Sequence, residues 1–127
     1  MTSRPILDDA QIAQKVKRMA YEIYEDHYDS KELTIVGIKK QGSILADILL
    51  KELKKIFTIE YTLIEAEPDK KNPENYSPDL QEQESSIKGK KLIIVDDVLN
   101  SGRTMMHVIR PFLSYKPKSI QVAVLIK

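Results

Sequence analysis

The sequence predicts an α/β protein with an open parallel sheet and helices on both faces. Short, almost wholly apolar runs rich in β-branched residues recur along the chain, and segments with apolar residues at helical spacing alternate with them. Strands that contain few polar positions are typical of a parallel sheet covered on both faces. In such folds ligands bind at the carboxyl ends of the strands.

Each expected element rests on its own local pattern. A helix capped by Asp8 or Asp9 is expected to run to about Asp26, because apolar residues recur there at helical spacing. Further helices are expected at residues 43–56 and 104–114, the second kinked or ended near Pro111. The expected strands are "LTIVGI" (33–38), "FTIEYTLI" (57–64), "KLIIV" (91–95) and "SIQVAVLI" (119–126).

Residues 65–86 interrupt this alternation with three prolines, many charges and few apolar side chains. A segment of this length without periodicity is either a functional lid or disordered, and the two are compatible. We expect a flexible loop here within a single domain that spans residues 1–127.

Composition excludes several classes of function. The chain has 20 basic and 19 acidic residues, a net charge of +1, so bulk charge gives no support to RNA binding. It has no cysteine, which excludes disulfides and thiolate metal sites. The first residues lack the apolar run of a secretory leader, and no segment approaches about 18 apolar residues. We therefore expect a soluble cytoplasmic protein that makes no membrane contact.

The stretch "LIIVDDVLNSGRT" (92–104) ends a buried strand in two carboxylates and places a glycine turn behind them. Free N–H groups at the start of the following helix, with nearby hydroxyls, could surround a phosphate. The alternative is a routine strand-to-helix turn with a serine N-cap. The candidate phosphate-binding residues are Asn100, Ser101, Gly102, Arg103 and Thr104.

The acidic pair, Asp96 and Asp97, favours a ligand over a routine turn. Adjacent carboxylates repel one another unless a hydroxyl donor or a hard cation lies between them, and a ribose diol or hydrated Mg²⁺ meets that need. A ligand with a phosphate at one end and a diol in the middle satisfies both halves of the motif. If the strand continues through the pair, the two side chains point to opposite faces, and one could be structural.

A second motif, "GIKKQG" (37–42), lies between an expected strand and helix and therefore at the same edge of the sheet. Its lysines and backbone N–H groups could hold a second phosphate group. It is not a Walker A loop, because Gly42 is followed by Ser43 rather than by Lys and Ser/Thr. The candidate residues are Lys39, Lys40, Gln41 and Gly42.

Four other side chains give weaker signals. His27 and His107 lack a paired spacing, so surface or packing roles are favoured over a metal site. Tyr61 and Tyr76 could stack on a base, although ordinary strand and loop roles are favoured.

"LIIVDDVLNSGRT" resembles the signature of the type I phosphoribosyltransferases at every position. "ILDDAQIAQKVKRMAYEIYE" is similar to the N-terminal helix of the bifunctional pyrimidine operon regulators that are also uracil phosphoribosyltransferases. "VGIKKQG" occupies the place of their pyrophosphate loop, and "SIQVAVLI" that of a core strand. The resemblance covers nearly the whole chain except residues 65–86, where the family has its flexible catalytic loop.

This resemblance implies a phosphoribosyltransferase-type, Rossmann-like core and transfer of a phosphoribosyl group from phosphoribosyl pyrophosphate (PRPP) to a nucleobase. It implies that Asp96 and Asp97 contact the ribose hydroxyls, and the metal only through PRPP and water. Asn100 to Thr104 would hold the 5′-phosphate, and Lys39 to Gly42 the pyrophosphate with a bridging Mg²⁺. Residues 65–86 would shield the reaction from water. The family also implies a homodimer or higher homo-oligomer.

The sequence departs from the family pattern at three places. Relatives of the pyrimidine regulator type have Arg at the position of Gln41, so a charge is missing, for which Lys40 could compensate. Asn100 stands where the 6-oxopurine enzymes have an Asp, which weighs against hypoxanthine or guanine as the base. The sequence ends at Lys127, just after the last core strand, so we expect little or no C-terminal hood to hold the base.

Three readings of these features compete. A PRPP-dependent transferase acting on a nucleobase, with a pyrimidine favoured, accounts for most of them. The alternative is a catalytically weak PRPP- or nucleotide-binding regulatory protein, which Gln41 and the expected lack of a hood favour. A phosphorylation-switched receiver domain would have its acidic pair after the first strand, whereas Asp96 and Asp97 follow the penultimate strand.

We expect Gly102→Val to abolish binding of the 5′-phosphate, because a branched side chain would fill the space that the turn needs. Calorimetric titration with PRPP and Mg²⁺ measures the effect. Tight binding by this variant would refute the assignment of residues 100–104 as the phosphate site.

Overall fold

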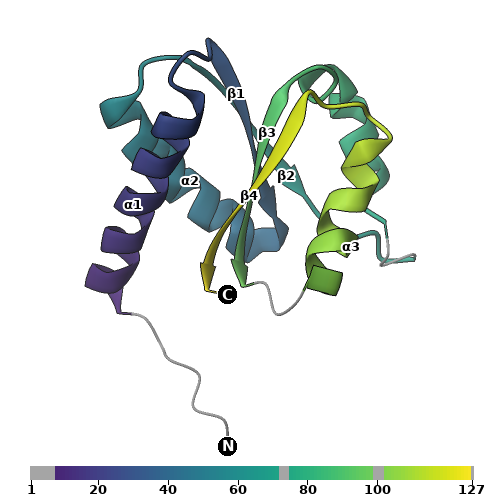
Figure 1. Cartoon of the computed structure of the whole chain (residues 1–127). Helices are drawn as coiled ribbons and strands as arrows, with labels where there is room; N and C mark the ends of the chain where they lie inside the picture. The colour runs from purple at the N-terminus through teal and green to yellow at the C-terminus, as the bar shows by residue number, and fades with distance from the viewer. Residues whose placement is uncertain (1–7, 72–74, 99–101, 127) are drawn as a thin grey trace, which may run out of the picture.

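Four parallel strands form the sheet, in the order β2-β1-β3-β4 (Figure 1). The structure, a computed structural model, describes residues 8–71, 75–98 and 102–126, with the backbone alone at 78–79, 98, 102–105 and 126. The strands are β1 (Glu32–Ile38), β2 (Glu60–Ala66), β3 (Lys91–Val98) and β4 (Ser119–Ile126). Their order places β1 and β3, which carry the candidate motifs, side by side at the centre.

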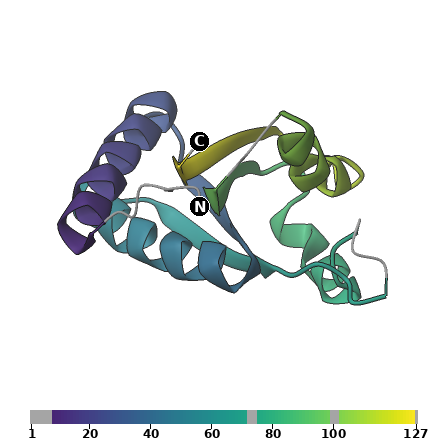
Figure 2. The same cartoon turned by 90° about the horizontal axis from the view of Figure 1, so that it is seen from below.

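Helical segments cover both faces of this sheet (Figures 1 and 2). On one face, α1 (Asp9–His27) and α2 (Lys39–Ile56) share a core with Leu33, Ile93 and Val95 of the central strands. On the other face, the 3₁₀ segment η1 (Pro78–Ser86) and α3 (Gly102–Leu113) share a core with Leu92 and Ile94. The predicted fold class is therefore confirmed.

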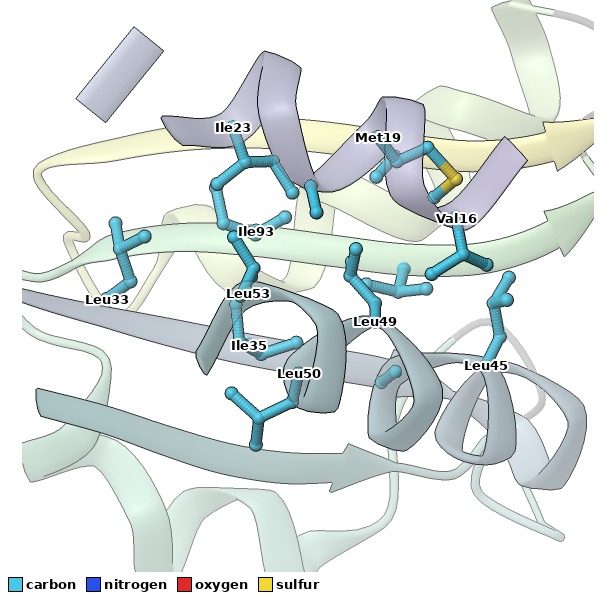
Figure 3. Packing of buried hydrophobic residues seen from close by; sticks show 14 of the residues in the cluster. Val16, Met19, Ile23, Leu33, Ile35, Leu45, Leu49, Leu50, Leu53 and Ile93 are labelled. Atoms are coloured by element: carbon cyan, nitrogen blue, oxygen red, sulfur yellow. The ribbon is translucent and has the colours of Figure 1, made fainter. Parts of the chain in front are cut away.

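The two cores explain why β3 has four consecutive apolar residues, Leu92 to Val95. Along β3, Leu92 and Ile94 face α3, whereas Ile93 and Val95 face α1 and α2, and all four are fully buried. Burying each such side chain contributes about 1.5 to 3 kcal/mol to folding. Figure 3 shows the α1–α2 core, in which side chains of both helices pack onto Leu33, Ile35 and Ile93.

The ends of α1 are fixed by polar contacts that the sequence partly predicts. Asp8 is the N-cap: its Oδ1 accepts from the Gln11 N–H at 2.7 Å, and the Gln11 side chain accepts from the Asp8 N–H at 3.0 Å. At the other end, His27 is buried, and its Nε2 lies 2.7 Å from Gln121 Oε1 of β4. The packing role favoured for His27 is confirmed.

The bounds of four elements differ most from the prediction. α2 begins at Lys39 instead of residue 43, so "KKQG" is its first turn and not a free loop. β2 is shifted to Glu60–Ala66. β3 continues through both aspartates to Val98, and α3 begins at Gly102 instead of residue 104. Helix and strand ends depend on tertiary contacts that periodicity does not report.

Residues 65–86 contain ordered structure that their composition hides. They include the end of β2, an isolated antiparallel bridge between Pro68 and Tyr76, and η1. Leu80 is buried, and the Thr34 hydroxyl of β1 donates to the Ser86 carbonyl at 2.9 Å. One buried apolar side chain and one hydrogen bond thus attach η1 to the rest of the fold. That the segment is flexible stays a prediction.

None of the helices within the described ranges is both long and apolar enough to cross a membrane.

Candidate active site

The two candidate motifs meet at the carboxyl edge of the sheet, which Figure 2 views from the side to which β3 and β4 point. Gly37 of β1 pairs with Glu65 of β2 on one side and with Val95 of β3 on the other. Because the strands are parallel and in this register, the start of α2 at Lys39 and the aspartates near the end of β3 lie at the same edge of the sheet. The sequence expectation of a shared edge is therefore met by the backbone.

Two glycines allow the first turn of α2 to lie directly on the central strands. A Cβ added at Gly42 would lie 2.8 Å from the Val95 carbonyl oxygen, and one at Gly37 would lie 2.5 Å from Ser43 Cα. Real Cβ atoms do not approach backbone this closely, so both positions require glycine. This contact sets the distance between the "KKQG" turn and the aspartates of β3.

The backbone at the start of α2 is held in an unfavourable conformation. Lys39 has φ of 61°, in the left-handed region that residues with a side chain seldom adopt. Such a conformation costs on the order of 1 kcal/mol and recurs at functional sites. It brings the chain from the end of β1 into α2 without an intervening loop, so the N–H groups of residues 39–42 lie at a helix N-terminus beside the sheet edge.

Asp96 is the buried member of the acidic pair, with 9% of its surface exposed. Burial, and then the neighbouring Asp97 carboxylate, raise the pKa of Asp96 to about 6, although the Asp97 backbone N–H and the Lys39 ammonium act in the opposite direction. Asp96 Oδ1 accepts from that N–H at 2.8 Å. A carboxyl group in this environment gains from any ligand that donates hydrogen bonds to it or adds positive charge.

The two aspartates face different sides of the sheet, because β3 continues through them and strand side chains alternate. Asp96 lies on the α3 side, where its charge helps raise the pKa of Tyr76 after the larger effect of burial. Asp97 is half-buried on the side of α2. A ligand that bridges this edge can therefore reach one carboxylate from each face.

The phosphate motif is only partly within the described residues. Asn100 and Ser101 lie outside them. α3 begins at Gly102, so the backbone of Gly102, Arg103 and Thr104 forms the first turn of a helix. A helix of this length with its N-terminus at the carboxyl edge is compatible with the predicted anion site.

Glu65 and Glu67 line a cavity beside the candidate site, which sequence reasoning missed. Both are exposed, and they flank the buried Ala66 at the end of β2, so they lie close together. The Glu65 side chain is the main cause that raises the pKa of Glu67, and Lys39 partly offsets it. Both line a cavity of about 430 Å³ with Lys40 and Ser43. The signal was present, since "EAE" ends a strand just as the aspartate pair does.

No group of three or more His, Asp or Glu side chains within the described ranges could hold a metal ion by itself. Asp96 and Asp97 supply carboxylate oxygens, which suit a hard cation, but too few to complete an octahedral shell. The residues present therefore fit Mg²⁺ that arrives with most of its ligands from water and a bound phosphate compound.

Comparison with known proteins identifies the class to which this fold and edge belong. The family model described as "Phosphoribosyl transferase domain" matches residues 3–127. The chain therefore belongs to the phosphoribosyltransferase family. Members of this family are transferases, so the chain is a transferase enzyme. The resemblance inferred from the sequence is confirmed.

Individual relatives point to one branch of this family. The chain is 34% identical to the "Bifunctional protein PyrR" of Fusobacterium nucleatum subsp. nucleatum over 95% of its length and 72% of that protein's length. It is 30% identical to the "Bifunctional protein pyrR" of Enterococcus faecalis over 99% of its length and 74% of that protein's.

The fold is shared with a solved phosphoribosyltransferase. A hypoxanthine-guanine phosphoribosyltransferase from Bacillus anthracis superposes with a TM-score of 0.72 over 96% of this chain and 69% of that chain. The two are 19% identical, so this likeness concerns the fold alone.

We expect Gly42→Ala to destabilise the fold by about 1 to 3 kcal/mol, because the new methyl group would overlap the Val95 carbonyl oxygen. Elsewhere in a helix the same change stabilises by about 0.5 to 1 kcal/mol, so the sign is diagnostic. Urea denaturation measures it. Gln41→Ala, an exposed neighbour in the same turn, is the control and should stay within about 0.5 kcal/mol of the parent.

We expect Asp96→Asn to make the stability of the protein without substrate less dependent on pH. Because the pKa of folded Asp96 is raised from 3.8 to about 6, the folded state binds more protons than the unfolded state between those values. The parent therefore loses stability as the pH rises through this window. Across this window, the melting temperature of Asp96→Asn should rise relative to that of the parent as the pH rises. Parallel curves would show that Asp96 titrates normally.

Proposed function

We propose that the chain transfers the phosphoribosyl group of PRPP to a pyrimidine nucleobase and releases pyrophosphate. The observation that carries this proposal is the meeting of the "KKQG" turn of α2 with the Asp96–Asp97 pair at one sheet edge, held by the glycine contacts of Gly37 and Gly42. A ligand with phosphates at both ends and a diol between them is the chemistry that such an edge suits.

The pyrophosphate end of PRPP lies, in this proposal, on the first turn of α2. The N–H groups at this helix start, together with the helix dipole, favour an anion. Lys39 and Lys40 add positive charge, Gln41 adds an uncharged donor, and Gly42 leaves room for the turn to lie against β3. These groups hold the leaving group while the bond to the sugar breaks.

The ribose lies between this turn and β3. Asp96 and Asp97 accept hydrogen bonds from the 2′ and 3′ hydroxyls, which relieves the repulsion between the two carboxylates. Above a pH of about 6, Asp96 is ionised, and the carboxylate accepts hydrogen bonds more strongly than the protonated carboxyl group does. Asp96 and Asp97 would hold Mg²⁺ through water, and the ion would supply positive charge beside the pyrophosphate.

The 5′-phosphate binds, in this proposal, at Asn100, Ser101, Gly102, Arg103 and Thr104, where α3 begins. A nitrogen of the nucleobase then attacks C1 of the ribose as the bond from C1 to the pyrophosphate oxygen breaks. Positive charge develops on the sugar, so water must be excluded, and we assign this role to residues 65–86.

Two features support a pyrimidine as the base. Asn100 stands where the 6-oxopurine enzymes carry a proton-accepting Asp, and an amide cannot act as a general base. The relatives with 30% and 34% identity bear the name PyrR, the group that the sequence resembles. A role in nucleotide salvage in the cytoplasm, as a homo-oligomer, is the corresponding cellular proposal.

A catalytically weak PRPP-binding regulatory protein is the second candidate. Gln41 lacks the charge of the Arg found in this branch, and Glu65 and Glu67 line the cavity beside Lys40. Negative charge near this end weakens the binding of pyrophosphate. It has less effect on the binding of a nucleotide, which carries no pyrophosphate group there.

We expect release of pyrophosphate from PRPP and Mg²⁺ with uracil and not with hypoxanthine, guanine, xanthine or adenine. Orotate tests whether a pyrimidine carboxylate is accepted. Coupled detection of pyrophosphate measures the rate for each base. No release with any base, by a protein that still binds PRPP in calorimetry, would support the regulatory candidate instead.

Asp97→Asn is the matched variant for this assay. It removes one carboxylate charge with little change of volume, so PRPP binding should weaken by about 10-fold or more, the usual effect of losing a charged hydrogen bond. Circular dichroism should show an unchanged fold. Unchanged affinity would remove Asp97 from the site.

A further inference from the structure

Tyr76 connects the segment after β2 to α3. The segment doubles back on itself, since the Ser77 N–H donates to the Glu67 carbonyl at 2.7 Å and the Asp69 N–H to the Asn75 carbonyl at 2.8 Å. Pro68 and Tyr76 form the antiparallel bridge between them. From this stem, the half-buried Tyr76 hydroxyl donates to the Val108 carbonyl of α3 at 2.9 Å.

α3 needs an external support at this place, because Pro111 lies inside it. Proline has no N–H, so the bond that residue 111 would donate to the His107 carbonyl is missing, and the ring crowds the preceding turn. Helices bend at such positions. The N-terminal half of α3, which begins at Gly102, is thus attached to the C-terminal half by a weakened turn.

Tyr76 contacts both sides of this weak turn. Its hydroxyl binds Val108, three residues before the proline, and its ring packs on Phe112, one residue after it, with the ring centroids 5.1 Å apart. Phe112 is fully buried in the core beneath α3, so it is a fixed point. Because Tyr76 contacts α3 on both sides of Pro111, it limits bending of the helix at the proline.

We propose that Tyr76 is a positioning residue that sets the direction of the N-terminal half of α3 and thereby the place of the 5′-phosphate site relative to Asp96. The part of this inference that concerns the 5′-phosphate site rests on the proposed function, whereas the part that concerns the direction of α3 does not. The "Tyr76 contact" denotes the hydroxyl bond to Val108 together with the ring packing on Phe112. It couples the stem after β2 to the helix whose first turn holds the phosphate.

The position of Tyr76 beside Asp96 fits this role. The Asp96 carboxylate contributes to the raised pKa of Tyr76, after the larger effect of burial, so the two side chains share one environment. Asp96 is held by β3, whereas the phosphate site is held by α3, and Tyr76 packs against the core that these two elements share. Because the 5′-phosphate is remote from the breaking bond, a misplaced α3 weakens the ground state and the transition state alike, which raises KM without lowering kcat.

The first test measures the direction of α3 without substrate. Tyr76→Phe keeps the ring and removes the hydroxyl, so amides in the N-terminal half of α3 should exchange hydrogen about 3- to 10-fold faster, the effect of one lost hydrogen bond. Amides of β1 and β3 should be unchanged. Mass spectrometry of peptic fragments measures both, and it needs no activity, so it stands even if the proposed reaction fails.

The second test asks whether the effect depends on the proline. In the parent background, Tyr76→Phe should raise the KM for PRPP, or its Kd if turnover is absent, by about 3- to 10-fold with kcat within about twofold. In a Pro111→Ala background, residue 111 regains its N–H and the helix supports itself, so the same change should have an effect below about twofold.

Tyr61→Phe is the matched control. The Tyr61 hydroxyl also donates to a backbone carbonyl, that of Phe57, at 2.6 Å, but it lies on β2 facing the α1–α2 core. It should change neither the exchange of α3 nor the affinity for PRPP. Equal effects of Tyr76→Phe with and without Pro111, or unchanged exchange in α3, would overturn the positioning role and leave Tyr76 as ordinary packing.

Discussion

The close contact between the first turn of α2 and the central strands is the constraint on which the candidate site depends. Gly37 and Gly42 have no space for a Cβ, with 2.5 and 2.8 Å to the nearest backbone atoms of the facing segment. Only that approach lets the chain pass from β1 into α2 without a loop and puts the helix N-terminus beside Asp96. A larger residue at either position would separate the pyrophosphate side of the site from the ribose side.

The ligand-free edge holds several unfavourable features at once. Lys39 has a left-handed backbone conformation, and Asp96 is a buried carboxyl group with a raised pKa. The pKa of Glu67 is raised as well, mainly by Glu65. The two carboxyl features would be relieved by hydroxyl donors or by positive charge brought with a substrate. Strain and perturbed titration that gather at one edge of an otherwise well-packed sheet are what a binding site requires, since a site satisfied by its own residues has little to gain from a ligand.

Much of the fold could be predicted from the sequence because the patterns that specify it are local. The apolar runs of β1 and β3 report burial on both faces, and the expected bounds of β4 match the structure at both ends. The thirteen-residue motif at 92–104 was specific enough to indicate the family, which the match over residues 3–127 confirms. Local patterns did not show the start of α2, which a glycine contact decides, or the 3₁₀ segment η1, which the burial of Leu80 and the hydrogen bond from Thr34 hold in place.

By itself, then, the sequence determined the order of the elements and the shared edge of the two motifs, and it supplied the candidate residues for phosphate and diol, because each depends on neighbours along the chain. The tertiary structure alone decided which aspartate is buried, that Glu65 and Glu67 adjoin Lys40, and that Tyr76 reaches across the proline turn of α3. These relations join residues tens of positions apart. Their energies arise from burial, charge and hydrogen bonding between elements, which exist only once the sheet has brought those elements together.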